Sequence, residues 1–272
     1  MKSDCPLPAI IMKLSIIIPA YNEGVNIRTT VRDVVATMNR HLSEYEVIVV
    51  DDGSHDNTSA QARRVKSERV KVLTLKHNHG KGGALTYGVR HAKGELVTFL
   101  DAGGDFHPKQ IVRLTKLMEA LNADIVIGSK RHPMSKVNYP RIRRLYSWIY
   151  QVLIRILFRL KVRDTQTGLK VFKRQVLAKV LPRVLVKRYA FDLELLVVAN
   201  ALGFTKISEG PIDMRYNFQT TGINRAEIRH ILVDTAAIFY RTHILRYYTS
   251  RASGARSKLL PFTRSKLLNK KR

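Results

Sequence analysis

Three short polar clusters in the first hundred residues carry side chains that could hold a metal ion against a phosphate. They are Tyr21-Asn22-Glu23, Asp51-Asp52-Gly53 and Asp101-Ala102-Gly103, and each directly follows a short apolar run. Carboxylate oxygens are preferred ligands of Mg²⁺ and Mn²⁺, and such an ion can neutralise a departing diphosphate. An Asp-Gly pair alone is commonly only a turn. The three clusters together predict a site in which Asp101 binds Mg²⁺ or Mn²⁺.

A glycine-rich segment over residues 78–83 adds a second kind of phosphate ligand. Its sequence is Asn-His-Gly-Lys-Gly-Gly, and a helical pattern follows it. Backbone N–H groups at a helix start bind phosphate, and the Lys81 ammonium would assist them. The segment is not a Walker A sequence, because no Ser or Thr follows the lysine.

The elements that must position these residues alternate between strand and helix. Apolar runs predict strands, and apolar residues at spacings of three and four predict helices. The predicted strands are 14–19, 46–50, 70–75, 95–100 and 123–128, and the predicted helices are 27–42, 58–66, one opening at 80–83, and 111–121. This alternation indicates an α/β fold with a mostly parallel, doubly wound sheet. Ligands of such sheets bind beyond the carboxyl ends of the strands, where all three polar clusters fall.

The charge balance indicates a polyanionic partner. The 272 residues include 48 Lys and Arg against 21 Asp and Glu, a formal net charge of +27, and a single cysteine excludes an intramolecular disulfide. Residues 130–163 contain ten Lys or Arg and no acid, and the chain after Asp234 repeats that pattern. Nucleic acid and anionic lipid would both satisfy such a surface.

Two later helical patterns favour anionic lipid over nucleic acid as the partner. Residues 141–162 and 228–239 are apolar on broad faces and are accompanied by arginine. Such helices suit a membrane interface, although packing of the first against the sheet is the alternative. No stretch reaches the roughly 18 uninterrupted apolar residues of a spanning helix, and no secretory signal is evident. We therefore expect a peripheral protein at the cytoplasmic face of a membrane, with an anionic membrane surface as partner and a membrane-anchoring subunit as an optional further one.

Several motifs resemble the family 2 glycosyltransferases of GT-A fold, and among them the dolichyl- and polyprenyl-phosphate sugar synthases. The resemblance spans roughly residues 14–225. The matching segments are 15–23, 49–58, 78–84, 101–102, 128–129, 164–172 and 191–196. It implies inverting transfer of a hexose, glucose or mannose, from a nucleotide-sugar to dolichyl or polyprenyl phosphate.

The resemblance also assigns roles to individual residues. The implied catalytic residues are Asp101 and Asp192. The implied donor-binding residues are Pro19, Ala20, Tyr21, Glu23, Val49, Asp51, Lys81, Asp101 and Ala102. The implied acceptor- or phosphate-binding residues are Lys130, Arg131, Gln166, Glu194, Arg215 and Arg225. Because a phosphate monoester is already an anionic nucleophile, positioning and charge neutralisation should dominate over general-base catalysis.

One departure from the family pattern concerns the metal. Family members commonly read Asp-x-Asp, whereas Asp101-Ala102-Gly103-Gly104-Asp105 lacks the second carboxylate and has one at 105. We predict that Asp105 replaces the missing ligand. The alternative is that Asp105 caps the helix that follows Pro108.

The predicted organisation is a GT-A domain over residues 1–225, with the interface helix 141–162 inside it, followed by an amphipathic helix and basic tail over 226–272. Two other functions stay open. One is a glycosyltransferase acting on a glycan or protein hydroxyl, for which Asp192 would serve as base. The other is a basic nucleic-acid-binding α/β protein, which we disfavour because acidic strand ends would repel phosphate without a metal.

Overall fold

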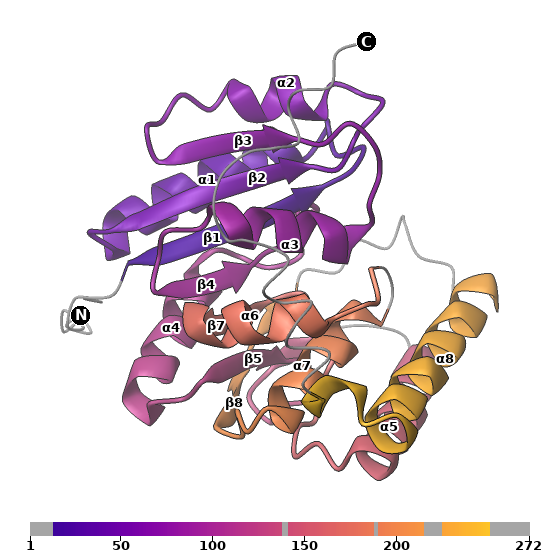
Figure 1. The fold of residues 1–272 in the computed structure, drawn as a ribbon. Helices are drawn as coiled ribbons and strands as arrows, with labels where there is room; N and C mark the ends of the chain where they lie inside the picture. The colour runs from indigo at the N-terminus through magenta and orange to yellow at the C-terminus, as the bar shows by residue number, and fades with distance from the viewer. Residues whose placement is uncertain (1–12, 138–140, 188–189, 215–224, 251–272) are drawn as a thin grey trace.

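A seven-stranded sheet is the centre of the fold (Figure 1). The computed structural model describes residues 13–137, 141–187, 190–214 and 225–250. The strands are β1 (Leu14–Ala20), β2 (Tyr45–Asp51), β3 (Val70–Thr74), β4 (Leu96–Phe99), β5 (Ile125–Ser129), β6 (Lys136–Val137), β7 (Lys170–Lys173), β8 (Ile207–Pro211) and β9 (Asp213–Met214). The sheet order is β3-β2-β1-β4-β7-β5-β8, and β6 pairs with β9 separately.

The helices cover both faces of this sheet. They are α1 (Ile27–His41), α2 (Thr58–Arg63), α3 (Lys81–His91), α4 (Lys109–Leu121), α5 (Arg141–Phe158), α6 (Arg174–Val180), α7 (Phe191–Ala201) and α8 (Arg225–Phe239), with short turns η1 (Leu181–Arg183), η3 (Tyr240–Ile244) and η4 (Tyr247–Thr249). In Figure 1, α3, α6 and α7 lie in front of the sheet, whereas α1 and α4 lie behind it. The predicted α/β fold with a mostly parallel sheet is confirmed.

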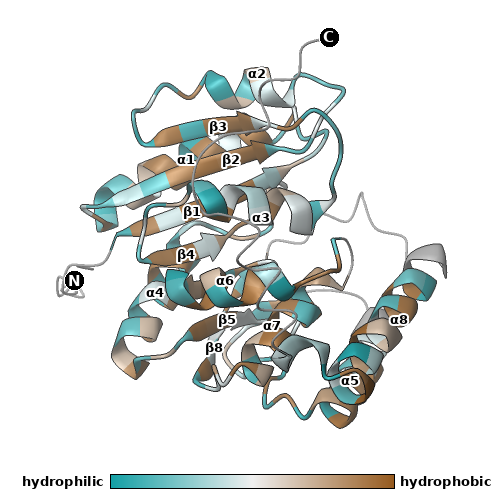
Figure 2. Ribbon diagram, viewed as in Figure 1, coloured by the Kyte–Doolittle hydropathy of each residue, from teal (hydrophilic) through white to brown (hydrophobic). Residues whose placement is uncertain are grey.

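The strands are buried on both faces, as parallel strands between two helical layers must be. Ile17 and Phe99 pack towards α3 and α7, whereas Ile16 and Ile18 pack towards α1 and α4, and all are at most 1% exposed. Figure 2 shows the resulting hydrophobic centre of the sheet. Five of the predicted strands are present as β1 to β5.

Strand β7 runs against its neighbours. It is antiparallel to both β4 and β5, so Phe99 pairs with Lys170 and Ile125 pairs with Phe172. Because its direction is reversed, the segment that enters β7 lies at the edge where the parallel strands end. This reversal brings residues 164–169 to the same edge as the three polar clusters.

Helices α5 and α8 lie side by side beyond that edge (Figure 1). The Tyr150 hydroxyl and the Thr235 hydroxyl are 2.9 Å apart, and Ile154 and Ile238 are buried in the core. Helix α5 ends at Phe158, short of the predicted end at 162. None of the helices in the described ranges is both long and apolar enough to cross a membrane.

Candidate active site

The loops after β1 and β2 hold each other in place. The Asn22 backbone amide donates to the Ser54 hydroxyl at 2.9 Å, and the His55 backbone amide donates to the Asn22 side-chain oxygen at 2.9 Å. The Glu23 amide donates to the Thr58 hydroxyl at 2.8 Å. Tyr21 is 41% exposed and meets the His55 ring edge-on. Pro19 and Ala20 end β1, and Val49 is buried in β2, so the predicted donor residues share one strand-end region.

The second acidic cluster connects this region to the glycine-rich segment. The Asp51 carboxylate accepts the Ser54 amide at 3.0 Å, and the Asp52 carboxylate accepts the His79 amide at 2.9 Å. Burial raises the pKa of Asp52, although the bonds from the His79 and Gly80 backbone oppose that rise. Asp52 therefore connects the end of β2 to the glycine-rich segment. This contact places the start of α3, and with it Lys81, beside the strand ends.

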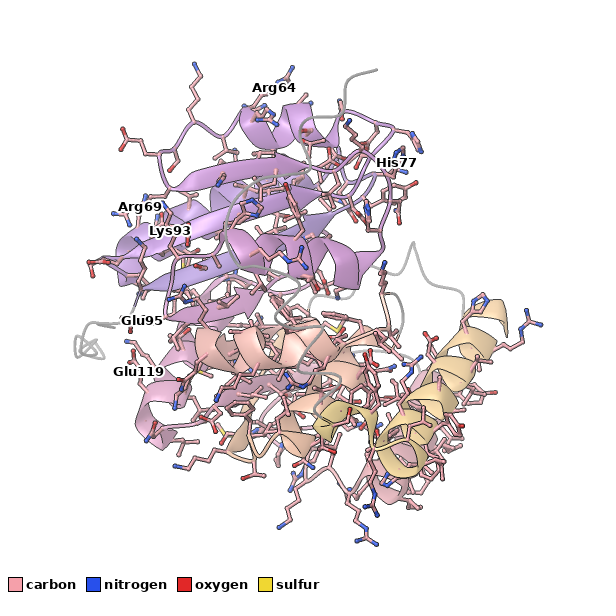
Figure 3. The ribbon with its side chains drawn as sticks, in the orientation of Figure 1. Arg64, Arg69, His77, Lys93, Glu95 and Glu119 are labelled. Atoms are coloured by element: carbon pink, nitrogen blue, oxygen red, sulfur yellow. The ribbon has the colours of Figure 1, made fainter. Side chains whose placement is uncertain are left out.

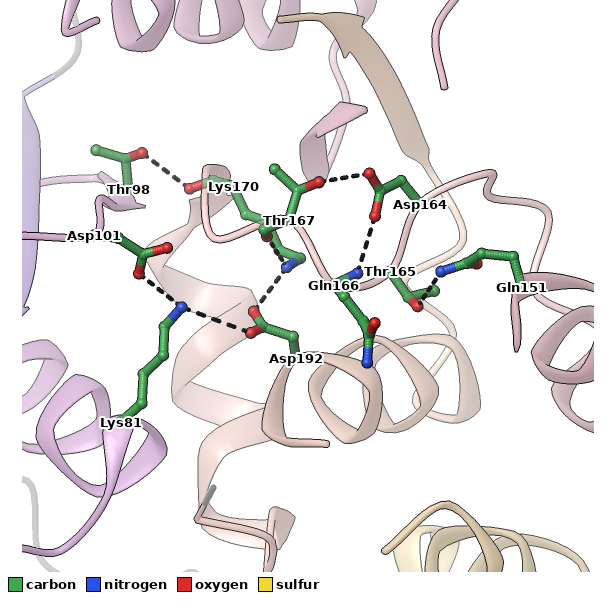
Figure 4. A network of polar contacts seen from close by, with 10 residues as sticks. All are labelled: Lys81, Thr98, Asp101, Gln151, Asp164, Thr165, Gln166, Thr167, Lys170 and Asp192. Carbon is green, nitrogen blue, oxygen red and sulfur yellow. Dashed lines mark hydrogen bonds and ion pairs between the residues drawn. The ribbon is translucent and has the colours of Figure 1, made fainter. Parts of the chain in front are cut away.

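Lys81 and Asp101 form an ion pair at the centre of the site (Figure 4). Their Nζ and Oδ1 atoms are 2.7 Å apart, and each side chain is about one third exposed. Burial by itself would lower the pKa of Lys81, but Asp101 and then Asp192 reverse this and raise it above its ordinary value. Burial would likewise raise the pKa of Asp101, and the Lys81 ammonium lowers it. Both groups are therefore charged at neutral pH.

A second lysine lies directly behind this pair. Lys170 of β7 is completely buried, and its Nζ lies 2.7 Å from Asp192 Oδ1 and also donates to the Thr167 carbonyl (Figure 4). The other oxygen of Asp192 lies 4.0 Å from Lys81 Nζ. Burial lowers the pKa of Lys170, and Asp192 opposes that effect. Lys81, Asp101, Asp192 and Lys170 thus form one charged network, and its fourth member was not among the predicted site residues.

Glycine is required where the backbone approaches this network. A Cβ on Gly168 would lie 2.0 Å from Asp101 Oδ2, and one on Gly82 would lie 2.3 Å from the Phe191 ring. The first contact shows that the 164–169 segment packs directly against the Asp101 carboxylate. The second holds α3 against the start of α7, which carries Asp192.

Asp105 lies within electrostatic reach of Asp101. Its pKa is raised by burial first and then by the Asp101 carboxylate, while Lys130 opposes the rise. It does not cap α4, because the helix begins after Pro108 without a side-chain cap. Among the described residues, no three or more His, Cys, Asp or Glu side chains are grouped to hold a metal ion. The carboxylates of Asp101 and Asp105 repel each other, and a cation between them would relieve that repulsion.

Asp164 organises the predicted acceptor side. Its carboxylate accepts hydrogen bonds from the Lys130 backbone amide at 3.0 Å, the Thr167 hydroxyl at 2.6 Å and the Gln166 backbone amide at 3.1 Å. Arg131 instead reaches α5, where its guanidinium donates to the Ser147 hydroxyl at 3.0 Å. The turn that carries Gln166 is therefore fixed between β5 and β7.

Glu194 is fully buried and occupied by internal contacts. It accepts the Leu185 amide at 2.8 Å and the Val186 amide at 2.6 Å, and it also bonds Arg241 at 3.0 Å and the Tyr248 hydroxyl. These contacts join α7 to the C-terminal turns. Arg215 lies outside the described residues, and Arg225 begins α8 with a side chain that is not described.

Family comparison agrees with this arrangement. The model of glycosyl transferase family 2 matches residues 15–181, which contain every strand of the sheet except β8. The chain belongs to this family. The match includes both loops that surround Lys81 and Asp101, as well as the segment that enters β7.

Similar proteins of this family include curated lipid-phosphate enzymes. The chain is 31% identical over 229 residues to a dolichyl-phosphate beta-glucosyltransferase of Trichomonas vaginalis, covering 78% of this chain and 68% of that one. It is 32% identical over 205 residues to the human dolichyl-phosphate beta-glucosyltransferase, covering 69% of this chain and 63% of that one. The chain thus spans somewhat less than two thirds of the human protein.

Solved structures show the same fold at lower identity. Glucosyl-3-phosphoglycerate synthase of Mycobacterium tuberculosis, solved with Mn²⁺, UDP-glucose and phosphoglyceric acid, superposes with a TM-score of 0.64 at 20% identity and covers 84% of this chain and 79% of that one. Mannosyl-3-phosphoglycerate synthase of Rubrobacter xylanophilus superposes with a TM-score of 0.66 at 18% identity and covers 85% of this chain and 74% of that one. These likenesses confirm the GT-A fold class predicted from the sequence.

Proposed function

We propose that this chain transfers glucose, with inversion, from UDP-glucose to the phosphate of a dolichyl or polyprenyl lipid. The observation that carries the proposal is the ion pair of Lys81 and Asp101, which lies between the two donor-side loops and the 164–169 segment. The curated relatives are named for glucosyl transfer to dolichyl phosphate, which favours glucose over mannose.

The proposed reaction needs little proton transfer. An oxygen of the lipid phosphate attacks the anomeric carbon from the face opposite the nucleotide. The bond between that carbon and the diphosphate oxygen breaks, and the electron pair leaves with UDP. The attacking phosphate is already anionic, so it needs no base to activate it. In this proposal the Lys81 ammonium exchanges its contact with Asp101 for one with the donor diphosphate, whose negative charge it neutralises.

Asp101 and Asp105 fit a divalent cation. Burial raises the pKa of Asp105 and the Asp101 carboxylate raises it further, and a cation would relieve both effects. We propose that these two carboxylates would hold Mg²⁺ or Mn²⁺. The ion would supply charge neutralisation for the leaving group.

Asp192 is better placed to position lysines than to remove a proton. One of its oxygens faces Lys170 at 2.7 Å and the other faces Lys81 at 4.0 Å. A base for a sugar or protein hydroxyl would need a free oxygen directed at the acceptor. This arrangement favours the phosphate acceptor over the hydroxyl acceptor.

The α5 and α8 helices support attachment to a membrane surface. Their exposed apolar side chains include Leu145, Trp148, Ile149 and Ile156 on α5, and Leu232 and Val233 on α8. We propose that these faces rest in the interface of the cytoplasmic leaflet, where the lipid phosphate is accessible. Binding to protein-free vesicles would show that the chain needs no separate anchoring subunit for this contact.

Transfer into lipid tests the proposal directly. The protein is incubated with polyprenyl phosphate, Mn²⁺ and radiolabelled UDP-glucose or GDP-mannose, and the mixture is extracted with organic solvent. We expect label from UDP-glucose in the organic phase, and its loss in Lys81→Met and Asp101→Asn. Lys93→Met is the matched control, because Lys93 is exposed at the opposite edge of the sheet (Figure 3). Label that stays in the water phase with both donors would refute the proposed function.

A further inference from the structure

A basic groove lies at the outer edge of the sheet. It has a volume of about 490 Å³ and lies between the end of α5 and the edge strand β8. Its lining residues are Arg155, Arg159, Leu160, Lys161, Arg163 and Glu209. Strands β7 and β5 separate β8 from β4, the strand that leads to Asp101. The groove is therefore distinct from the network of Lys81 and Asp101.

The backbone after α5 directs the cations into this groove. Arg159 adopts a left-handed conformation, with φ of 51°, while its amide still bonds the Arg155 carbonyl at 3.0 Å. The next residues then alternate in burial: Leu160 and Val162 are 2% and 4% exposed, whereas the three cations at 159, 161 and 163 are exposed. Every second side chain of this segment is therefore exposed, and the three exposed cations line the same groove. A left-handed residue directly after a helix is a common helix ending, and here it turns the chain out of α5 towards the groove.

The four cations that line the groove are not held in internal ion pairs. Within the described part of the chain, none of the four makes an ion pair or a side-chain hydrogen bond. The one carboxylate present, Glu209, accepts the Arg163 amide at 2.9 Å and the Asp164 amide at 3.0 Å. Four cations around a single carboxylate leave the groove with an excess of positive charge, which an entering anion would neutralise. Arginine is well suited to a phosphate, because its guanidinium can donate two parallel hydrogen bonds.

Exposed hydrocarbon lies at the same end of α5 as the groove. Ile156 follows Arg155 on α5 and is 70% exposed. The His243 ring bonds the Leu157 carbonyl at 2.8 Å, which brings η3 and its 63% exposed Ile244 to the end of α5. Figure 2 shows these helix ends with hydrophobic and hydrophilic residues close together. The fitting ligand has an anionic head and an apolar body.

We propose that the groove binds the phosphate headgroup of an anionic bilayer phospholipid, separate from the lipid phosphate that accepts the sugar. The inference rests on the proposed function in one respect, the contact of α5 with a membrane. A headgroup held here would fix how the domain faces the bilayer. Each cation close to an anionic surface strengthens binding by about fivefold.

Vesicle partitioning tests this site. The full chain is mixed with vesicles of phosphatidylcholine, with or without phosphatidylglycerol, and bound protein is measured by flotation. We expect binding to require phosphatidylglycerol, and Arg155→Gln with Arg163→Gln to weaken it by about tenfold to thirtyfold. The matched control is Arg64→Gln with Lys66→Gln, which removes the same charge from two exposed residues that follow α2, and Figure 3 shows Arg64 at the opposite end of the sheet. That control should weaken binding by less than about threefold.

A third variant separates loss of binding from loss of folding. Arg159→Gly removes a cation but suits the left-handed backbone, so it should raise the melting temperature while weakening phosphatidylglycerol binding several-fold. Vesicles of phosphatidylcholine with polyprenyl phosphate at the same surface charge form a further arm, on which the groove double variant should lose less binding than on phosphatidylglycerol.

Four results would overturn the proposal. They are equal losses in the groove and control variants, binding that ignores phosphatidylglycerol, an equal loss on polyprenyl phosphate vesicles, and tighter groove-dependent binding of duplex DNA. None of these readouts depends on sugar transfer. Failure of the proposed reaction and failure of the headgroup site are therefore distinguishable.

Discussion

Replacing Asp192 by asparagine should expose how the buried lysine is stabilised. Lys170 is fully buried, and its two partners are the Asp192 carboxylate at 2.7 Å and the Thr167 carbonyl. Removing one member of a buried ion pair costs about 3–5 kcal/mol. Since the Thr167 bond remains, we expect a loss near the lower end, about 3 kcal/mol of unfolding free energy. For a chain of this size the melting temperature should fall by about 6–12 °C.

A second substitution distinguishes this explanation from a general packing defect. Lys170→Met removes the buried charge, so the double variant Asp192→Asn with Lys170→Met should recover at least about 1 kcal/mol relative to Asp192→Asn alone. Urea unfolding of the four proteins measures this coupling. A double variant as unstable as Asp192→Asn would refute the reasoning, because the stranded ammonium would then not be the cause.

The pH dependence gives a third readout. Burial lowers the pKa of Lys170 below its ordinary value of 10.5, and Asp192 opposes this. In the pH range between the folded and unfolded pKa, the unfolded chain binds more protons, so stability rises with pH. Asp192→Asn should widen that range, and its unfolding free energy should therefore rise more steeply towards pH 10.5 than that of the parent protein. A slope that Asp192→Asn leaves unchanged would contradict the assignment.

Three further substitutions test other parts of the site. Gly168→Ala should reduce turnover by about 10²-fold, because its Cβ would lie 2.0 Å from Asp101 Oδ2 and displace that carboxylate; normal turnover would show that the carboxylate can move without loss of function. Asp105→Asn should reduce Mn²⁺-dependent turnover by about 10²-fold and slightly raise the melting temperature of the metal-free protein at neutral pH. The reason for that rise is that the raised pKa of Asp105 makes its ionised form destabilising above pH 3.8; a lower melting temperature would contradict it. Glu194→Gln should lower the melting temperature by about 6 °C or more, whereas the control Glu119→Gln, at a half-buried residue near the end of α4, should change it by under about 2 °C, both measured by calorimetry.

The amino-terminal half of the fold could be predicted because its signals are local. Strands β1 to β5 are short apolar runs, and α1 repeats apolar residues at helical spacing. The acidic clusters follow directly from these elements, since residues after parallel strands share one edge. That rule alone is enough to predict that these clusters lie close to Lys81.

The later half could not be predicted in the same way. Strand β7 is central and antiparallel, a property set by its neighbours rather than by its own four residues. Helix α7 is buried from Phe191 through Ala199, so no polar face reveals its period. Neither element could thus be placed from its own sequence. A lysine at a strand start is also ordinarily solvated, so Lys170 was not predicted as the partner of Asp192. Predicted roles for Arg215 and Arg225 stay predictions.

The position of β7 also bears on how the chain acquires its structure. Strand β4 is made early, but its neighbour on one side, β7, is synthesised only after α4, β5 and α5. An emerging polypeptide would therefore expose an unpaired strand edge for much of its translation, and open edges invite intermolecular pairing. Pairing across such a sequence separation slows folding. A chain truncated before residue 170 should consequently aggregate rather than form a smaller stable sheet.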